Sequence, residues 1–214
     1  MGKIRKKLIP PEVVPPQVVI ATKNPDKFRE IKTILNGLPV EFHNLGNISL
    51  PKEVGRSLTE NAILKAETSL KFTHTISIAD DTGLEVDTLN GLPGVYSSRF
   101  AGPNASYEEN RKKLLMLLGA RPINERKAKF RCVVAIAQQE EQTKVFEGEI
   151  EGYITYEERG NSGFGYDSIF MVPELGKTLA EITSNEKNKI SHRALALLKA
   201  KKYLKKQLLI NFDI

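Results

Sequence analysis

The chain has 214 residues, of which 40% are hydrophobic, enough to bury the core of one large domain and to exclude a disordered chain. The formal net charge of +6 favours a solvated basic surface and leaves attraction to nucleic acid or to a phosphate-rich small molecule as an alternative. The single cysteine, Cys132, excludes an internal disulfide, and no apolar stretch has the length of a signal-peptide core or a membrane span, so we expect a cytoplasmic protein.

The chain begins with a basic, proline-rich stretch, residues 1–16, that we interpret as a flexible leader ahead of a single domain, residues 17–214. A short apolar strand follows at 18–21. Asn24 is then a favourable helix N-cap, and Pro25 suits the first helical position. These signals predict a strand, a polar turn and a helix in succession.

Further strands and capped helices alternate along the rest of the chain. The pattern predicts strands at 40–45, 75–79 and 169–172 and a long antiparallel pair at 129–138 and 144–154. It predicts helices that open at capping boxes at 57–60 and 106–109, and a final helix from about Ser191. Because parallel and antiparallel signals are both present, we expect an α/β fold with mixed α+β character, in which helices flank a mixed β-sheet.

The strand predicted at 75–79 stops at two adjacent carboxylates, Asp80 and Asp81, and we expect the chain to turn there at Thr82 and Gly83. Like charges this close resist ionising together unless a proton or a cation lies between them. Mg²⁺ is the simplest cation for a site built from oxygen ligands. We therefore predict a metal-assisted reaction at this strand end; the alternative is an aspartate that caps a turn.

Glu53 is a candidate third acid for the same site. It lies in the loop before the helix that precedes the strand, so it can reach the same end of the sheet. The alternative, a surface glutamate, is the simpler interpretation when the sequence is considered alone.

The turn between the first strand and the first helix is a candidate anion site. Free backbone N–H groups at the start of a helix favour an anion. Lys23 and Lys27 add positive charge there, and Thr22 adds a hydroxyl. The alternative is an ordinary capped helix with two solvated lysines, and the spacing of a P-loop is absent.

A glycine-rich loop at 162–167 is a candidate site for a base. Its glycines allow a ligand to approach the backbone closely, and Phe164 stands between two of them. A base stacked on an aromatic ring contributes roughly 1–3 kcal/mol. Asp167 could accept a hydrogen bond from the edge of such a base. The alternatives are that Phe164 anchors the loop to the core and that Asp167 only caps backbone amides.

Three charged or titratable residues precede or open the final helix. They are Lys187, His192 and Arg193, and we expect the last two to point donors outward. The alternatives are a structural histidine and a surface arginine.

Together these pieces resemble the inosine triphosphate pyrophosphatase family, which acts on non-standard purine nucleoside triphosphates. The matching segments are ATKNPDK at 21–27, ENA at 60–62, ADDTGL at 79–84, LPGVYSSR at 92–99, GFGYD at 163–167 and ISHR at 190–193. The similarity spans roughly residues 17 to 205. Thr82 replaces a serine found in many members and keeps the hydroxyl, and Ser168 replaces a common proline.

The resemblance implies hydrolysis of ITP, dITP and XTP to the monophosphate and pyrophosphate, with Mg²⁺ as cofactor, in a homodimer. It implies an elongated mixed sheet with two lobes and a central nucleotide cleft. By matching position, Asp81 would be the general base and, with Glu53, a metal ligand. The phosphates would be held by Thr22, Lys23, Asn24, Pro25, Asp26, Lys27, Thr82 and Lys187. The base would be held by Phe164, Gly165, Tyr166, Asp167, His192 and Arg193.

Two rival functions remain open on the sequence. One is a related pyrophosphatase that acts on other modified nucleotides, such as methylated ones. The other is a nucleic-acid-binding module that uses the positive charge, although no recognised nucleic-acid-binding motif is present. We expect a small-molecule nucleoside triphosphate as the partner, and neither nucleic acid nor a membrane.

Overall fold

The computed structural model describes residues 15–51 and 55–210, with the side chains of the last two left out. Its strands form one mixed sheet in the order β2-β1-β3-β5-β6-β7-β8, and β4 pairs with β3. They are β1 (Gln17–Ile20), β2 (Glu41–Asn44), β3 (Ile76–Val86), β4 (Pro93–Gly94), β5 (Lys127–Ala137), β6 (Lys144–Ile154), β7 (Phe170–Val172) and β8 (Lys177–Thr178). β1 runs parallel to β2 and β3, and the remaining pairs are antiparallel.

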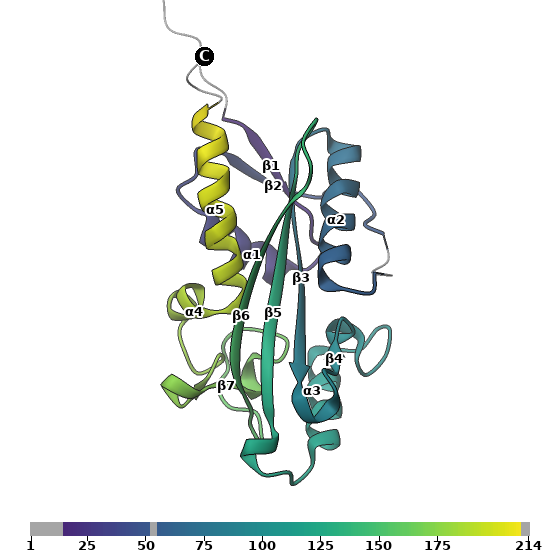
Figure 1. Ribbon diagram of the computed structural model, residues 1–214, viewed down its shortest axis with the longest axis vertical. Helices are drawn as coiled ribbons and strands as arrows, with labels where there is room; N and C mark the ends of the chain where they lie inside the picture. Colours follow the sequence, from purple (N-terminus) through teal and green to yellow (C-terminus); the bar gives the residue numbers. More distant parts are fainter. Residues whose placement is uncertain (1–14, 52–54, 211–214) are drawn as a thin grey trace, which may run out of the picture.

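Five α-helices surround this sheet in the part of the chain that the structure describes. They are α1 (Pro25–Leu35), α2 (Leu58–Thr73), α3 (Tyr107–Leu118), α4 (Ser184–Ile190) and α5 (His192–Ile210). Figure 1 shows that β3, β5 and β6 run the length of an elongated molecule, with α5 and α2 on opposite sides of them in the upper lobe. The lower lobe contains α3, β4 and β7. The predicted two-lobed mixed sheet is therefore confirmed.

The core is divided by the sheet. On one face of the upper lobe, Ile78 of β3 packs with α1 and α5 residues such as Ile31 and Leu197, and on the other face Ala79 packs with Ala62 of α2. A third cluster in the lower lobe includes Phe130. Because strand side chains alternate between faces, consecutive residues of β3 point into different parts of the molecule.

The prediction that the strand ends at the acid pair is wrong. β3 continues through both aspartates, which stand opposite Val134 and Val133 of β5, as far as Val86. Nor is there a turn at Thr82 and Gly83, since both lie inside the strand. A Cβ on Gly83 would lie 2.8 Å from the carbonyl oxygen of Gly94, so this glycine admits the close approach of β4 rather than a turn.

The predicted helix starts are confirmed. Asn24 accepts hydrogen bonds from the backbone of Asp26 and Lys27, and Ser106 forms a complete capping box with Glu109. Ser57 caps α2, but its predicted capping box is incomplete, because Glu60 accepts a bond from the backbone of Arg56 instead. α1 and α2 pack on opposite faces of β3, and this arrangement positions the site.

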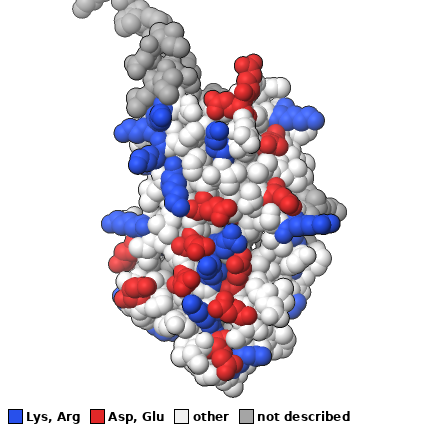
Figure 2. Space-filling view, in the orientation of Figure 1, with Lys and Arg blue, Asp and Glu red and all other residues white. Residues whose placement is uncertain are grey.

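Charged side chains on the long strands form an ordered ladder. Lys127, Lys129 and Arg131 of β5 pair with glutamates of β6 and with Glu85 of β3. Figure 2 shows blue and red side chains alternating along the long axis of this face. The cations of this ladder are therefore balanced by carboxylates, whereas Lys and Arg side chains gather at the upper left of this face, over α5.

Candidate active site

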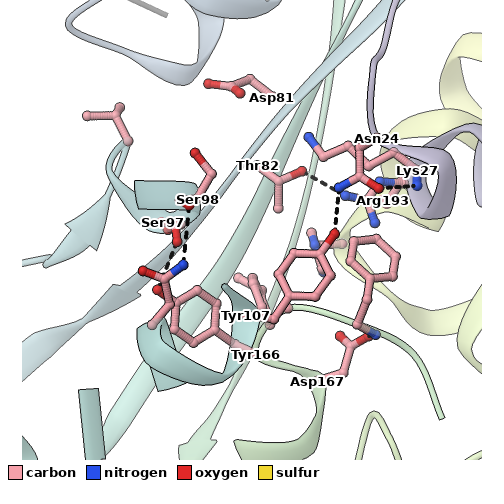
Figure 3. Close-up of a pocket in the computed structure, with 16 residues that line it drawn as sticks. Asn24, Lys27, Asp81, Thr82, Ser97, Ser98, Tyr107, Tyr166, Asp167 and Arg193 are labelled. Atoms are coloured by element: carbon pink, nitrogen blue, oxygen red, sulfur yellow. Dashed lines mark hydrogen bonds between the residues drawn. The ribbon is translucent and has the colours of Figure 1, made fainter. Parts of the chain in front are cut away.

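A pocket with a volume of about 100 Å³ lies where the two lobes meet, and Figure 3 shows it from within. Ten of the residues predicted for the site line it: Asn24, Lys27, Asp81, Thr82, Phe164, Gly165, Tyr166, Asp167, His192 and Arg193. Six other residues complete its wall: Val95, Ser97, Ser98, Tyr107, Asn110 and Phe130. Residues from all four candidate segments, which are far apart in the sequence, therefore line one pocket.

The remaining predicted residues lie beside the pocket. Thr22, Lys23 and Pro25 line an adjoining groove of about 710 Å³, which shares Asn24 with the pocket. Asp26 accepts a hydrogen bond of 3.3 Å from the hydroxyl of Tyr107 at the rim. Lys187 sits over the ring of Phe164 at 4.8 Å. Glu53 falls outside the residues that the structure describes.

Asp80 is the centre of a buried cationic network on the side of the sheet covered by α1 and α5. Its Oδ2 atom lies 3.0 Å from Lys27 Nζ and 3.2 Å from Arg193 Nε, and it accepts a 3.1 Å hydrogen bond from Thr82. Burial alone would raise the pKa of Asp80, but Lys27, Arg193 and Lys65 outweigh it and hold that pKa well below its usual range. Asp80 is therefore a permanent carboxylate that anchors two cations.

Asp81 points to the opposite face of the sheet, toward α2. Its carboxylate accepts hydrogen bonds of 3.0 Å from Lys65 and 3.1 Å from Asn61. In Figure 3 it is directed away from the group formed by Asn24, Lys27 and Arg193. The expectation that one cation lies between the two aspartates is therefore wrong, because β3 separates them and each has cationic partners of its own.

The carboxylate of Asp81 is compatible with a divalent ion that arrives with the substrate phosphates. No group of three or more His, Cys, Asp or Glu side chains among the described residues is arranged to hold a metal. Mg²⁺, however, is commonly held by one or two carboxylates together with substrate phosphates and water. The carboxylate of Asp81 at the pocket wall meets that requirement, and Glu53 lies in the preceding segment of the chain.

Arg193 and His192 are both buried at the start of the last helix, so the expectation that their donors face outward is wrong, and Lys187 of α4 is buried as well. Arg193 is 2% exposed; it lies 2.6 Å from Glu30 and donates a 3.1 Å hydrogen bond to Thr82. Lys187 lies 2.5 Å from Glu30 and 2.6 Å from Asp167. Burial would raise the pKa of Glu30, but these two cations hold it below its usual range. Glu30 thus joins the two cations in one network.

Close packing of α5 against β6 fixes the first turn of that helix. A Cβ on Gly148 would lie 2.2 Å from the carbonyl oxygen of His192 and 2.5 Å from the backbone nitrogen of Ala196. Only a glycine allows the helix to approach the strand this closely. The absence of one side chain on β6 therefore sets the depth at which His192 and Arg193 enter the pocket.

The glycine-rich loop at 162–167 is held by Asp167 from within and by Arg111 of α3. The carboxylate of Asp167 accepts a 2.8 Å hydrogen bond from the backbone N–H of Phe164. Asp167 therefore caps this turn, which is one of the two roles predicted for it. Gly163 has a φ of +74°, and a Cβ there would lie 2.2 Å from the same carboxylate. Arg111 of α3 donates a 2.9 Å hydrogen bond to the carbonyl of Gly165. Phe164 itself is half-buried at the pocket wall.

His192 is a neutral imidazole that stacks on Phe130. The two ring centroids are 4.3 Å apart and the planes differ by 5°. Burial and the nearby charges of Arg193 and Lys187 lower the pKa of His192 well below its ordinary value. The imidazole can therefore donate or accept a hydrogen bond without carrying a charge.

This buried histidine predicts an acid-sensitive stability. Below about pH 6.5 the unfolded chain binds a proton at His192 that the folded chain does not, so the free energy of unfolding falls as the pH drops. We expect the free energy of unfolding, measured by urea denaturation, to fall between about pH 6.5 and 5 in the wild type. In the variant His192→Gln we expect it to fall less over the same range. An equal pH slope in the wild type and the variant would contradict the prediction.

Besides the six other wall residues named above, which include Tyr107 and Asn110, two residues that hold the site in place were not singled out on the sequence. They are Glu30 and Lys65. Lys65 carried a signal, since it lies one helical turn beyond Asn61 on a face otherwise made of small residues such as Ala62 and Ala66. Glu30 lies three residues after Lys27, on the same side of α1.

The chain matches proteins of one family over most of its length. The family model described as Ham1 family matches residues 18–203. A protein of Thermoanaerobacter sp. strain X514 named dITP/XTP pyrophosphatase is 50% identical over 195 residues, which cover 90% of this chain and 98% of that protein. A protein of the same name from Bacillus subtilis strain 168 is 46% identical, with the same coverage.

Solved structures agree with these relatives. A HAM1 protein from Coxiella burnetii superposes with a TM-score of 0.81 at 39% identity and covers 89% of this chain and 99% of its own. The Ham1 protein of Staphylococcus aureus superposes with a TM-score of 0.79, with the same identity and coverage. Five of the six segments that carry the resemblance line the pocket, and Asn61 of the sixth donates a hydrogen bond to Asp81. Within residues 15–51 and 55–210 no helix has the length and hydrophobicity to cross a membrane. The chain belongs to the Ham1 family.

Proposed function

We propose that this protein hydrolyses dITP, ITP and XTP. Water attacks the α-phosphorus, the bond between that phosphorus and the bridging oxygen breaks, and the nucleoside monophosphate and pyrophosphate leave. One observation carries the proposal: a carboxylate, the start of a helix suited to phosphate binding and a loop suited to base binding all line one pocket. The chain is also 50% identical to a protein named dITP/XTP pyrophosphatase.

Asp81 orients and deprotonates the attacking water in this proposal. General base catalysis of this kind contributes about 10²–10⁴-fold to the rate. Lys65 and Asn61, at 3.0 and 3.1 Å, hold the carboxylate in place from α2. Asp81 and Glu53 would hold Mg²⁺, which when bound neutralises charge on the triphosphate.

The start of α1 and the strand β3 bind the phosphates. Asn24, Lys27 and Thr82 line the pocket, and Thr22 and Lys23 line the groove that continues from Asn24. The exposed fraction of the Lys27 side chain is 17%, and its ion pair with Asp80 fixes its position. This arrangement supports a path for the tail of the triphosphate along the groove.

The loop with Phe164 and the start of α5 bind the base. Arg193 has five N–H donors, and among the described residues three are used on Asp80, Glu30 and Thr82. A donor that remains suits the 6-oxo group of hypoxanthine or xanthine and leaves the 6-amino group of adenine without a partner. The buried Nδ1 atom of His192, without a hydrogen-bond partner among the described residues, offers a second contact.

Lys187 is better placed to support the base site than to hold phosphates, the role suggested by matching position. It lies between Glu30 and Asp167 and beneath Phe164, with its side chain 4% exposed. Two carboxylates balance its charge. We assign it to the positioning of Phe164 and Arg193.

A substrate panel tests the function. Pyrophosphate release is expected from dITP, ITP and XTP and not from dATP or dGTP, and removal of divalent ions by a chelator is expected to stop it. Turnover confined to methylated or otherwise modified nucleotides would replace the proposal with the related activity. Salt-dependent binding of plain DNA without any nucleotide turnover would replace it with nucleic-acid binding.

The assembly that we propose is a cytoplasmic homodimer. Large apolar side chains are exposed in the lower lobe, among them Leu92, Tyr96 and Met116, and these are suited to an interface. Sedimentation equilibrium is expected to give about twice the chain mass of 23.9 kDa. A mass equal to that of one chain at micromolar concentration would contradict the dimer.

A further inference from the structure

Tyr107, the first residue of α3, connects the two lobes across the mouth of the pocket. Its hydroxyl accepts a 2.7 Å hydrogen bond from the side-chain amide of Asn24 and donates a 3.3 Å bond to Asp26. Figure 3 shows the Tyr107 ring beside the pocket, with the bond to Asn24 as a dashed line. Asn24 and Asp26 belong to the start of α1, so the contact joins the upper lobe to the lower lobe.

The cap of α1 fixes the direction in which the Asn24 amide donates. Its Oδ1 atom accepts from the backbone nitrogens of Asp26 at 2.9 Å and Lys27 at 3.3 Å. Since a carbonyl oxygen is needed for both bonds, the NH₂ group must point the other way, toward Tyr107. One of the two N–H groups of this amide is therefore engaged by the Tyr107 hydroxyl, at the start of the helix where the proposed function has a phosphate bind.

The Tyr107 ring also occupies space beside the aromatic residue of the base loop. The ring centroids of Tyr107 and Phe164 are 5.8 Å apart, with the planes tilted by 37°. Lys187 and Arg193 lie over the Phe164 ring at 4.8 and 5.3 Å. A base that stacks on Phe164 therefore has to take space that Tyr107 now occupies.

The pocket beside Tyr107 is small. Its volume of about 100 Å³ is smaller than the roughly 300–1,000 Å³ typical of ligand pockets. Tyr107 is 39% exposed and stands at the start of a helix, so its side chain can rotate toward solvent without unpacking a core. Rotation would widen the pocket and free Asn24 together.

We propose that Tyr107 is a latch that holds the nucleotide pocket closed and that the substrate must displace. The proposal rests on the function proposed above. A base that stacks on Phe164 displaces the Tyr107 side chain, so each molecule that binds substrate first breaks the bond between Tyr107 and Asn24. Removal of the hydroxyl alone therefore strengthens substrate binding, which is the reverse of what loss of a substrate contact would do.

The variant Tyr107→Phe tests the latch because it removes the hydroxyl and keeps the ring. A net hydrogen bond of ordinary strength corresponds to a change of about three- to tenfold in the equilibrium. We expect the KM for dITP to fall by about that factor with little change in kcat. We also expect inorganic tripolyphosphate to become a tighter competitive inhibitor by a similar factor, because it competes for the start of α1 without a base.

Tyr156→Phe is the matched control, since Tyr156 is 57% exposed and does not line the pocket. Its KM is expected to equal that of the wild type. A KM for Tyr107→Phe that stays within twofold of the wild type, or rises, would overturn the latch while the wild type still hydrolyses dITP. A wild type without dITP turnover would instead refute the proposed function.

Discussion

Replacing Asp81 by asparagine is expected to lower kcat for dITP by about 10²–10⁴-fold. The amide keeps the shape of the side chain and can still accept from Asn61, but it cannot take a proton from water. Asp81 is 4% exposed and 3.0 Å from Lys65, so the same change removes the negative charge opposite a buried ammonium. Breaking such a pair costs up to about 3–5 kcal/mol of unfolding free energy. Activity must therefore be measured together with stability.

The double variant Asp81→Asn with Lys65→Met separates the two effects. Replacing both members of a buried ion pair by uncharged groups is often neutral for stability. We expect the double variant to unfold near the wild-type urea midpoint and yet to release no pyrophosphate from dITP. A folded Asp81→Asn variant that retains more than a tenth of the wild-type kcat would remove Asp81 from the role of general base.

The variant Gly148→Ala is expected to reduce both stability and activity, although residue 148 does not line the pocket. The new methyl group would lie 2.2 Å from the carbonyl oxygen of His192, so the first turn of α5 must shift away from β6. Overpacking of this kind costs about 1–3 kcal/mol, or about 2–12 °C in Tm for a chain of this size. A displacement of about 1 Å at Arg193 would lower kcat/KM by about 10²-fold.

Glu149→Ala provides the control on the neighbouring position of β6. Its side chain is exposed and takes part in the charge ladder with Lys129 and Arg131, so the expected change in unfolding free energy is within about 0.5 kcal/mol. Differential scanning calorimetry and dITP kinetics measure both variants. A Gly148→Ala variant with the Tm and kcat/KM of the control would show that α5 is not held by this close contact.

Local signals in the sequence predicted the helices and strands well, because helix starts and strand alternation depend on residues close together in the chain. Asn24 and Pro25 mark the start of α1, Ser106 and Glu109 close a capping box, and the alternation in β5 and β6 identifies the long hairpin. Each signal acts over a few residues. The resemblance then indicated which of these elements meet at the site.

The error at Asp80 and Asp81 came from long-range charge, which no local pattern reveals. Two adjacent acids end a strand only when nothing neutralises them inside the fold. Lys27 and Arg193 from one side and Lys65 from the other neutralise them here, and these partners lie between 16 and 113 residues away in the sequence. For the same reason Arg193 resembled a surface charge until Glu30 and Asp80 were seen around it.

The unbroken course of β3 limits how this enzyme can open. Its pairing with β5 is continuous from Ser77 opposite Ala137 to Val86 opposite Ala128, across the level of the pocket. The two halves of the molecule therefore share one stiff ribbon and have no flexible joint in these strands about which to swing as rigid bodies. Access for a nucleotide is therefore expected at the rim, where α1 and α3 face each other across the contact between Asn24 and Tyr107.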